Sequence, residues 1–229
     1  IVFIVAQLVV LYAGAGIWAA VKHEGFQATL QAMTAGGNPA LLAITTVFSS
    51  IITLVVFLKA KWVVLTRDYL LSKPWFILLW VALFTLGAII PLEFLYEHLG
   101  LEMDENTGKL FEGLMKEPWG YVAVGILAPL TEEIVFRGAI LRSLLDMMSK
   151  KNHWVAIMIS AAMFGLAHGN TAQFVNALLM GLLLGWMYYR TKSLVPGILM
   201  HWVNNTMAYI LANLVPQSDG KLIDLFHGD

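Results

Sequence analysis

The chain has 229 residues, of which 59% are hydrophobic and only 13% are charged, and its mean hydropathy is +0.74. This composition excludes an ordinary soluble domain and predicts an integral membrane protein. The formal net charge of -1 gives no reason to expect a nucleic-acid partner. Since the chain has no cysteine, disulfides, thiol nucleophiles and thiolate metal ligands are excluded as well.

Apolar segments of the length needed to cross a bilayer, about 20 residues, recur along the whole sequence. Because the chain begins with Ile1 rather than methionine, we expect that it starts inside a longer gene product or after trimming. The sequence predicts an all-α, polytopic helical bundle with about seven membrane spans, at residues 1–21, 39–58, 75–92, 119–145, 154–167, 172–189 and 194–214.

Basic residues in the predicted loops indicate how the bundle is oriented. With seven spans, nine of them fall on one side of the membrane, and that excess marks the cytoplasmic side. The amino terminus is therefore predicted to be cytoplasmic. The nine are Lys59, Lys61, Arg67, Lys73, Arg142, Lys150, Lys151, Arg190 and Lys192, against Lys22, Lys109, Lys116 and Lys221 on the other side.

The segments between and after the spans suggest three regions. Residues 1–118 hold three spans and an acidic outer loop, 119–214 hold the polar motifs described below, and 215–229 form a polar tail. Within the outer loop, Leu110, Phe111, Leu114 and Met115 recur at helical spacing, which predicts an amphipathic helix. Small residues in the first and sixth spans, including Gly181 and Gly185, predict close helix packing.

The fourth predicted span carries three charges inside an apolar helix, Glu132, Glu133 and Arg137. Unpaired charges in hydrocarbon cost several kcal/mol, so such residues normally face a protein interior or a wet cavity. Glu133 and Arg137 are four residues apart and share a helix face, which predicts an ion pair. Glu132 lies about 100° away around the helix, so it is the carboxylate left free for chemistry.

Two later spans add further polar residues. The fifth ends with Phe164 and His168, and the seventh contains His201 and Asn205 on one face. A single membrane histidine is usually an interhelical hydrogen bonder, but three polar sites in the late spans predict a shared polar cavity. At ~1.5 Å per residue, Glu132 and His201 come out at one depth, whereas His168 comes out ~10 Å higher.

A carboxylate and a histidine can polarise water as a general base, so that it attacks a peptide carbonyl. We assign Glu132 and His168 to the water and His201 and Asn205 to the oxyanion, because an imidazole N–H and a carboxamide can donate to it. Glu133, paired with Arg137, supports this site.

The alternative is that Glu132, His168 and His201 bind a catalytic zinc ion, since two histidines and a glutamate form an established zinc site. No H-E-x-x-H motif is present, so the expectation is that no cofactor is required. A serine protease is disfavoured because no G-x-S motif occurs, and a diaspartyl protease because no aspartate falls within a span.

Three motifs occur in order, on the fourth, fifth and seventh predicted spans: E-E-x-x-x-R at Glu132, Glu133 and Arg137, F-x-x-x-H at Phe164 and His168, and H-x-x-x-N at His201 and Asn205. In these motifs the chain resembles the CPBP intramembrane protease family, also called the ABI family, which includes the type II CAAX prenyl endopeptidases. The resemblance covers residues 119–214. It implies a helical membrane core with a polar cavity toward the cytoplasmic side, and peptide hydrolysis by glutamate-activated water.

The resemblance further implies a substrate that is a CAAX-type, prenylated or other membrane-associated peptide or protein, and the short loops suggest a prokaryotic cytoplasmic membrane. Two other functions stay open from the residues alone. One is a non-catalytic scaffold or regulator of other membrane proteins, in which the polar cluster is structural. The other is a small transporter, which is disfavoured because no repeat symmetry is found.

Overall fold

The computed structural model describes residues 1–101 and 103–214, and within these ranges the regular secondary structure is entirely helical. The all-α prediction is therefore confirmed, and helix is found at each of the seven predicted ranges. The long helices are α1 (Val2–Lys22), α3 (Pro39–Lys59), α5 (Trp75–His98), α10 (His153–Leu166), α11 (Thr171–Thr191) and α12 (Val195–Leu214). The predicted polar tail at 215–229 lies outside the described residues.

The fourth predicted span is one continuous helical run, but its winding changes along its length. It consists of α7 (Pro118–Gly120), η1 (Tyr121–Leu127), α8 (Ala128–Glu132), η2 (Glu133–Leu141) and α9 (Arg142–Met147), of which η1 and η2 are π-helical. The sequence analysis predicted a helix over this range but did not anticipate the π-helical segments. Shorter helices connect the long ones: α2 (Phe26–Thr34), α4 (Asp68–Leu71), α6 (Glu105–Lys116) and the 3₁₀ turn η3 (Lys150–Asn152).

Four of the described helices are long and apolar enough to cross a membrane: α1, α3, α5 over Trp75–Tyr96, and α11. Helix α5 also exposes large apolar side chains, since Trp75, Phe76 and Trp80 are each more than half exposed. Water-soluble monomers rarely expose contiguous apolar surface of this kind. This surface is suited to contact with lipid, as the composition predicts.

Side-chain caps explain where several helices begin. Asn38 Oδ1 accepts the backbone N–H of Leu41 at 3.2 Å, and Pro39 occupies the first helical position of α3. Asp104 caps α6 in the same way through the N–H of Thr107, at 3.0 Å. Such caps satisfy N–H groups that have no partner within the helix.

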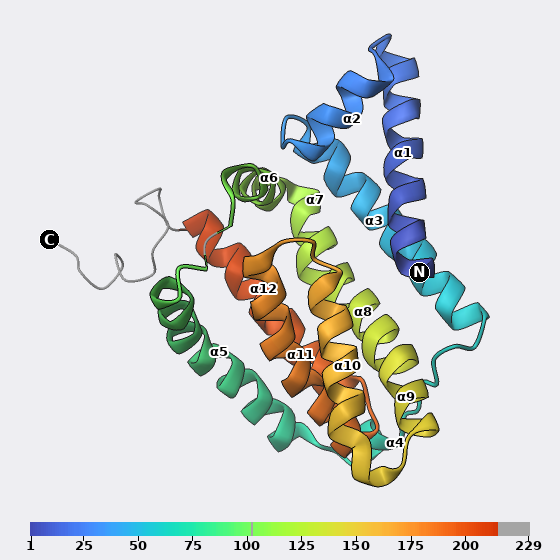
Figure 1. Cartoon of the computed structure of the whole chain (residues 1–229), viewed down its shortest axis with the longest axis vertical. Helices are drawn as coiled ribbons and strands as arrows, with labels where there is room; N and C mark the ends of the chain where they lie inside the picture. Colours follow the sequence, from blue (N-terminus) through green and yellow to red (C-terminus); the bar gives the residue numbers. More distant parts are fainter. Residues whose placement is uncertain (102, 215–229) are drawn as a thin grey trace, which may run out of the picture.

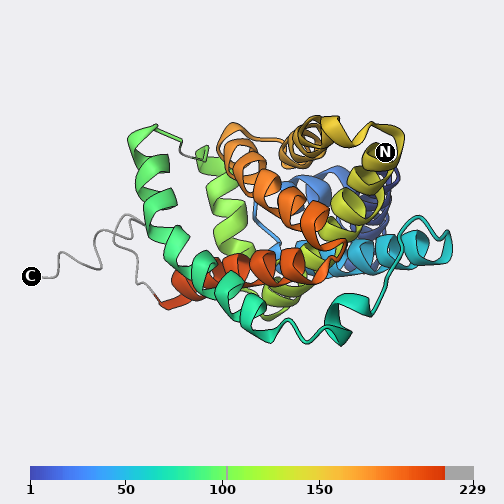
Figure 2. The ribbon, with the colours of Figure 1, turned by 90° about the horizontal axis from the view of Figure 1, so that it is seen from below.

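The long helices form a central group with two flanks (Figure 1). Helices α10 and α11 pack along each other as an antiparallel pair, and η2 packs on α10. Helices α1, α2 and α3 form one flank, while α5 lies on the opposite side and packs on α12 (Figures 1 and 2). The predicted site residues lie in the central group, on α8, η2, α10 and α12, and on the turn that follows α10.

Glycines allow the central helices to approach closely. A Cβ atom on Gly181 would lie 2.9 Å from Ala161 Cβ, and one on Gly185 would lie 2.9 Å from Ile157 Cγ2. These contacts join α11 to α10, so the predicted close packing at Gly181 and Gly185 is confirmed. In the first span, Gly14 packs in the same way against Thr45 of α3.

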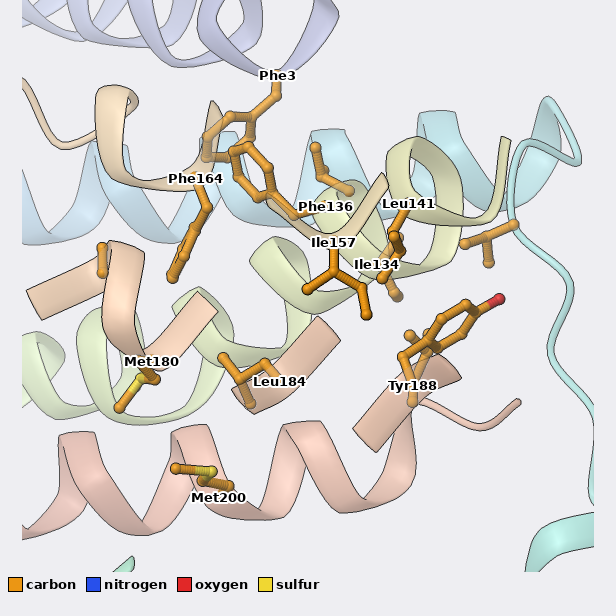
Figure 3. Packing of buried hydrophobic residues seen from close by; sticks show 14 of the residues in the cluster. Phe3, Ile134, Phe136, Leu141, Ile157, Phe164, Met180, Leu184, Tyr188 and Met200 are labelled. Carbon is orange, nitrogen blue, oxygen red and sulfur yellow. The ribbon is translucent and has the colours of Figure 1, made fainter. Parts of the chain in front are cut away.

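The main hydrophobic core is centred on η2 and the helices packed around it. Figure 3 shows Phe136 and Phe164 beside Phe3 of α1, with Leu184 of α11 and Met200 of α12 below them. The Phe3 and Phe136 rings meet edge to face at 5.9 Å. Helix α1 is thereby brought against the segment that carries the acidic pair.

The predicted amphipathic helix in the outer loop is confirmed as α6. Its Leu114 and Met115 are buried, and Asn213 of α12 donates from Nδ2 to the Met115 carbonyl at 3.0 Å. Part of its apolar side therefore packs on the protein.

Candidate active site

The acidic pair lies where α8 passes into the π-helical segment η2. Glu132 is the last residue of α8 and Glu133 the first of η2. π-helical turns are rare and often occur at functional sites. The two neighbouring carboxylates have different surroundings, because the Glu132 side chain is 16% exposed whereas that of Glu133 is 1% exposed. Glu132 is therefore the accessible carboxylate, in agreement with the sequence argument.

The predicted ion pair is confirmed and is fully buried. Arg137 Nη1 donates to Glu133 Oε1 at 2.9 Å, and Arg137 Nη2 donates to the Gly181 carbonyl at 3.3 Å. The guanidinium carbon also lies 4.5 Å from the centre of the Phe164 ring, a cation–π contact. Arg137 therefore fixes Glu133 and connects η2 to α10 and α11.

The second oxygen of Glu133 is held close to α12. A Cβ on Gly197 would come within 2.9 Å of Glu133 Oε2, so the backbone of α12 approaches closely at this point. One turn later, His201 Nδ1 lies 3.3 Å from Glu133 Oε1 and its Nε2 lies 3.6 Å from Glu132 Oε2. The first distance is that of a long hydrogen bond, and the second is a contact between a carboxylate and an imidazole.

His201 thus bridges the two carboxylates. It comes from a helix 68 positions along the chain from Glu133, and the ring is almost completely buried. The predicted common depth of Glu132 and His201 agrees with this contact.

His168 follows α10 in the turn that leads to α11. Its Nδ1 lies 3.0 Å from the Phe164 carbonyl, and because a carbonyl can only accept, Nδ1 carries the proton. In the neutral ring Nε2 then holds the lone pair. This is the tautomer that a proton acceptor at Nε2 requires.

The register between η2 and α10 explains how His168 reaches the level of Glu132. Ser160 Oγ donates to the Phe136 carbonyl at 2.8 Å, which fixes the two antiparallel helices against each other. Glu132 lies four residues before Phe136, and His168 eight residues after Ser160. At ~1.5 Å per residue, ~6 Å of offset remains, which two long side chains can span.

Glu132 and His168 line the same polar cavity, which has a volume of about 180 Å³. This exceeds the ~30 Å³ that one water occupies in the liquid, and the polar lining is suited to hydrating it. The complete lining is Phe3, Gln7, Glu132, Phe136, Phe164, Ala167, His168 and Gln173. The sequence analysis did not identify Phe3, Gln7 or Gln173, although polar residues inside predicted spans are a signal that could have marked both glutamines.

Phe164 connects the parts of the site. Its ring lies edge-on to His168 at 5.0 Å and to His201 at 5.8 Å, and it is 1% exposed. Because it also carries the cation–π contact with Arg137, a single ring contacts both histidines and the arginine.

Asn205 lies one turn beyond His201, with its carboxamide engaged by the protein. Its Nδ2 donates to the Val124 carbonyl in η1 at 2.9 Å, and its Oδ1 accepts from Asn204 at 3.3 Å. In the described part of the chain, neither His201 nor Asn205 is among the residues that line the cavity.

The zinc alternative requires Glu132, His168 and His201 in one coordination shell. Two ligands ~2.1 Å from a tetrahedral zinc ion lie about 3.4 Å apart, so the 3.6 Å between Glu132 Oε2 and His201 Nε2 suits a ligand pair. However, no group of three His, Asp or Glu side chains within residues 1–101 and 103–214 is placed to hold a metal ion. The arrangement therefore does not fit a three-ligand zinc site.

Comparisons with known proteins agree with the motifs. Residues 115–207 match the family model described as type II CAAX prenyl endopeptidase Rce1-like. The chain is 30% identical over 131 residues to YdiL of Bacillus subtilis, named as a candidate membrane peptidase, covering 57% of this chain and 52% of that protein. It is 29% identical over 150 residues to the membrane-embedded CAAX protease MroQ of Staphylococcus aureus, covering 63% and 60%.

The chain thus spans between about half and three fifths of the length of these curated relatives. No solved structure matches it significantly. The matched segment contains the acidic pair, both histidines and Asn205. Residues 115–207 are thus similar to the Rce1-like type II CAAX prenyl endopeptidases.

Proposed function

We propose that the protein is an intramembrane endopeptidase in which Glu132 activates a water molecule for attack on a peptide bond. The observation that carries this proposal is the shared polar cavity of Glu132 and His168. Its location among apolar helices supports the proposal, because ionisable residues in such helices are usually functional. The family of the matched segment and the peptidase names of both relatives agree with this activity.

In the proposed reaction, Glu132 accepts a proton from a water held between it and Nε2 of His168. The resulting hydroxide forms a bond to the scissile carbonyl carbon and generates a tetrahedral oxyanion. The C–N bond then breaks, and Glu132 returns the proton to the leaving nitrogen. The products are a carboxylic acid and an amine, so one water is consumed for each bond cleaved.

The buried groups behind the cavity support this step. Glu133 is held by Arg137 and contacts His201, and His201 in turn contacts Glu132. We propose that this arrangement fixes the orientation of the Glu132 carboxylate. The roles assigned to His201 and Asn205 at the oxyanion are part of the same proposal. For Asn205 this role requires that its Nδ2 donate to the oxyanion in place of the Val124 carbonyl.

We further propose that the reaction needs no metal ion, because no three-ligand group is found among the described residues. We also propose that the chain crosses a prokaryotic membrane seven times, with its amino terminus in the cytoplasm. The excess of basic residues in one set of predicted loops supports this orientation.

The proposed substrate is a membrane-associated peptide or protein that carries an apolar group, such as a prenylated CAAX-type segment. A second cavity, of about 260 Å³, supports this class because apolar and aromatic side chains of α5, α11 and α12 line it, among them Trp80, Trp186 and Met200. Met200 directly precedes His201. A reporter peptide with and without a lipid chain tests this preference through the ratio of kcat/KM values.

Cleavage of such a reporter by the purified protein, with Glu132→Gln and His168→Ala as variants, tests the activity itself. We expect Glu132→Gln to abolish detectable cleavage and His168→Ala to lower kcat by about 10²–10⁴-fold, the usual contribution of a positioned acid or base. Glu105→Gln and His98→Ala are matched controls, because both residues are exposed and distant in sequence from the site. Both controls should retain wild-type kcat.

Wild-type activity in Glu132→Gln would refute the peptidase proposal. If that variant also kept the biological effect of the protein, the scaffold function would be the better explanation. Circular dichroism of each variant establishes that a loss of activity is not a loss of fold.

A further inference from the structure

A glutamine outside the three motifs lies in the cavity beside the proposed catalytic pair. Gln173 is in the first turn of α11, it is partly buried, and its side chain lines the cavity together with Glu132 and His168. A carboxamide can present either its oxygen or its NH₂ group to a cavity. The surrounding hydrogen bonds decide which of the two it is.

The cap of α11 fixes the orientation of Asn170. The backbone N–H of Gln173 donates to Asn170 Oδ1 at 2.9 Å, as in an ordinary helix N-cap. Since Oδ1 faces this N–H, the other terminal atom of Asn170 is its NH₂ group. That group donates to the His168 carbonyl at 3.3 Å and to Gln173 Oε1 at 2.6 Å.

The orientation of Asn170 in turn fixes that of Gln173. With the carboxamide of Gln173 flipped, its NH₂ group would meet the NH₂ group of Asn170, donor against donor. Gln173 Oε1 is therefore held on Asn170, and Nε2 keeps its two N–H donors. Within the described part of the chain, no protein acceptor is bonded to Nε2. A residue of the cavity lining thus carries a donor group that has no bond to a described protein acceptor.

The turn that carries these residues is firmly held. Gly169 has φ +74, a conformation that residues with a Cβ rarely adopt, and it reverses the chain between α10 and α11. A Cβ on Gly165 would lie 2.9 Å from the Phe174 carbonyl oxygen, so the first turn of α11 lies directly against the end of α10. This packing holds the turn that carries His168 against the helix that carries Gln173.

From these contacts we propose that Gln173 is a catalytic residue whose Nε2 donates a hydrogen bond to the oxyanion formed at the scissile carbonyl. The other candidate donors are less available: the nitrogens of His201 face Glu133 and Glu132, and Nδ2 of Asn205 donates to the Val124 carbonyl. A fixed donor needs no reorganisation when charge develops, which is why oxyanion holes are effective. This inference rests on the proposed peptidase function.

Steady-state kinetics on the reporter peptide test the inference with two substitutions of Gln173. Gln173→Ala removes the donor, and the isosteric Gln173→Glu replaces it by an oxygen. We expect both to lower kcat by about 10²–10³-fold, the usual effect of losing one oxyanion donor, while KM stays nearly unchanged. Gln31→Ala, an exposed glutamine on α2, is the matched control and should retain wild-type kcat.

Asn170 provides a test that leaves Gln173 itself in place. Asn170→Asp keeps the helix cap, but its second oxygen accepts from Gln173 Nε2 and so turns the carboxamide oxygen toward the cavity. We expect a fall in kcat of about tenfold or more, measured at a temperature where circular dichroism shows the variant folded, because the variant also loses the bond to the His168 carbonyl. Asn170→Ser keeps the cap without enforcing the flip and should retain more activity than Asn170→Asp.

Each outcome is decisive. If Glu132→Gln is inactive while both Gln173 variants and Asn170→Asp match the wild type, the inference is overturned and the peptidase function stands. A rise in KM at unchanged kcat would place Gln173 in substrate binding only and would also overturn it. If the wild type cleaves no better than Glu132→Gln, the proposed function fails and this inference fails with it. Should Gln173→Ala not fold, Gln173→Glu and Asn170→Asp still decide the question.

Discussion

Replacement of Arg137 by methionine tests whether the buried ion pair holds the site together. Arg137→Met keeps an unbranched, flexible side chain but removes the guanidinium. Three contacts are lost at once: the 2.9 Å bond to Glu133, the 3.3 Å bond to the Gly181 carbonyl and the cation–π contact with Phe164. The Glu133 carboxylate is then left in a setting where only 1% of its side chain is exposed.

The size of the effect follows from this burial. Removing one partner of a buried pair typically destabilises a protein by about 3–5 kcal/mol, because the other charge stays behind without compensation. For a chain of this size, ~1 kcal/mol corresponds to about 2–4 °C in Tm, so Tm should fall by roughly 6–20 °C. Arg142→Met is the control, since the partly exposed Arg142 pairs with the exposed Asp146 only at 3.7 Å, and surface pairs contribute ~0–1 kcal/mol.

Thermal unfolding in detergent, followed by intrinsic tryptophan fluorescence, measures both variants under the same conditions. The double variant Glu133→Gln/Arg137→Met removes both charges and should recover part of the lost Tm, because no uncompensated charge remains. A Tm for Arg137→Met within 2 °C of the Arg142→Met value, about the shift expected for 1 kcal/mol or less, would refute the argument. The argument would also be refuted if the double variant lost more stability than the single variants Glu133→Gln and Arg137→Met lose in sum.

Three further predictions concern helix packing and metal dependence. Gly181→Ala places a Cβ 2.9 Å from Ala161 Cβ and should destabilise the protein by about 1–3 kcal/mol. The control Gly87→Ala, with no atom within 4 Å of its Cβ, should change the free energy of unfolding by about 1 kcal/mol or less. Chemical denaturation measures the free energy of unfolding of both variants. Gly197→Ala pushes a methyl group against Glu133 Oε2, so the kcat for the reporter peptide should fall even at temperatures where circular dichroism shows the variant folded. An unchanged kcat would contradict the role of this close contact. Finally, prolonged dialysis against a zinc chelator should leave kcat unchanged, and a loss that is restored by added zinc would support the metal alternative instead.

Much of the fold could be predicted because it depends on local sequence. Hydropathy over ~20 residues marks where a helix can be buried in lipid, and helix was found at each predicted range. Caps such as Asn38 with Pro39 and ion pairs at i, i+4 such as Glu133 with Arg137 involve residues within a single turn. The spacing also distinguished the paired carboxylate from the free one, and the exposure of Glu132 agrees with that distinction.

Contacts between helices could not be read from the same patterns. The sequence could not predict that His201 would bridge both carboxylates or that the Phe164 ring would contact both histidines, because each contact depends on how distant helices rotate and slide against one another. The register between Ser160 and Phe136 could not be predicted either, because it is set by a hydrogen bond between two helices. The π-helical winding of η1 and η2 was not predicted either.

The sequence by itself determined that the chain is helical and apolar, which residues carry charge within it, and which motifs it shares with a protease family. Only the tertiary structure decided that Glu132 lines a cavity while Glu133 is buried behind it, and that Gln173 lines the same cavity with its carboxamide oxygen held by Asn170. The physical reason is that hydropathy and helix periodicity are properties of neighbouring residues. A cavity is formed by side chains from several helices, and its lining is determined by close packing, including that of glycines such as Gly165 and Gly197.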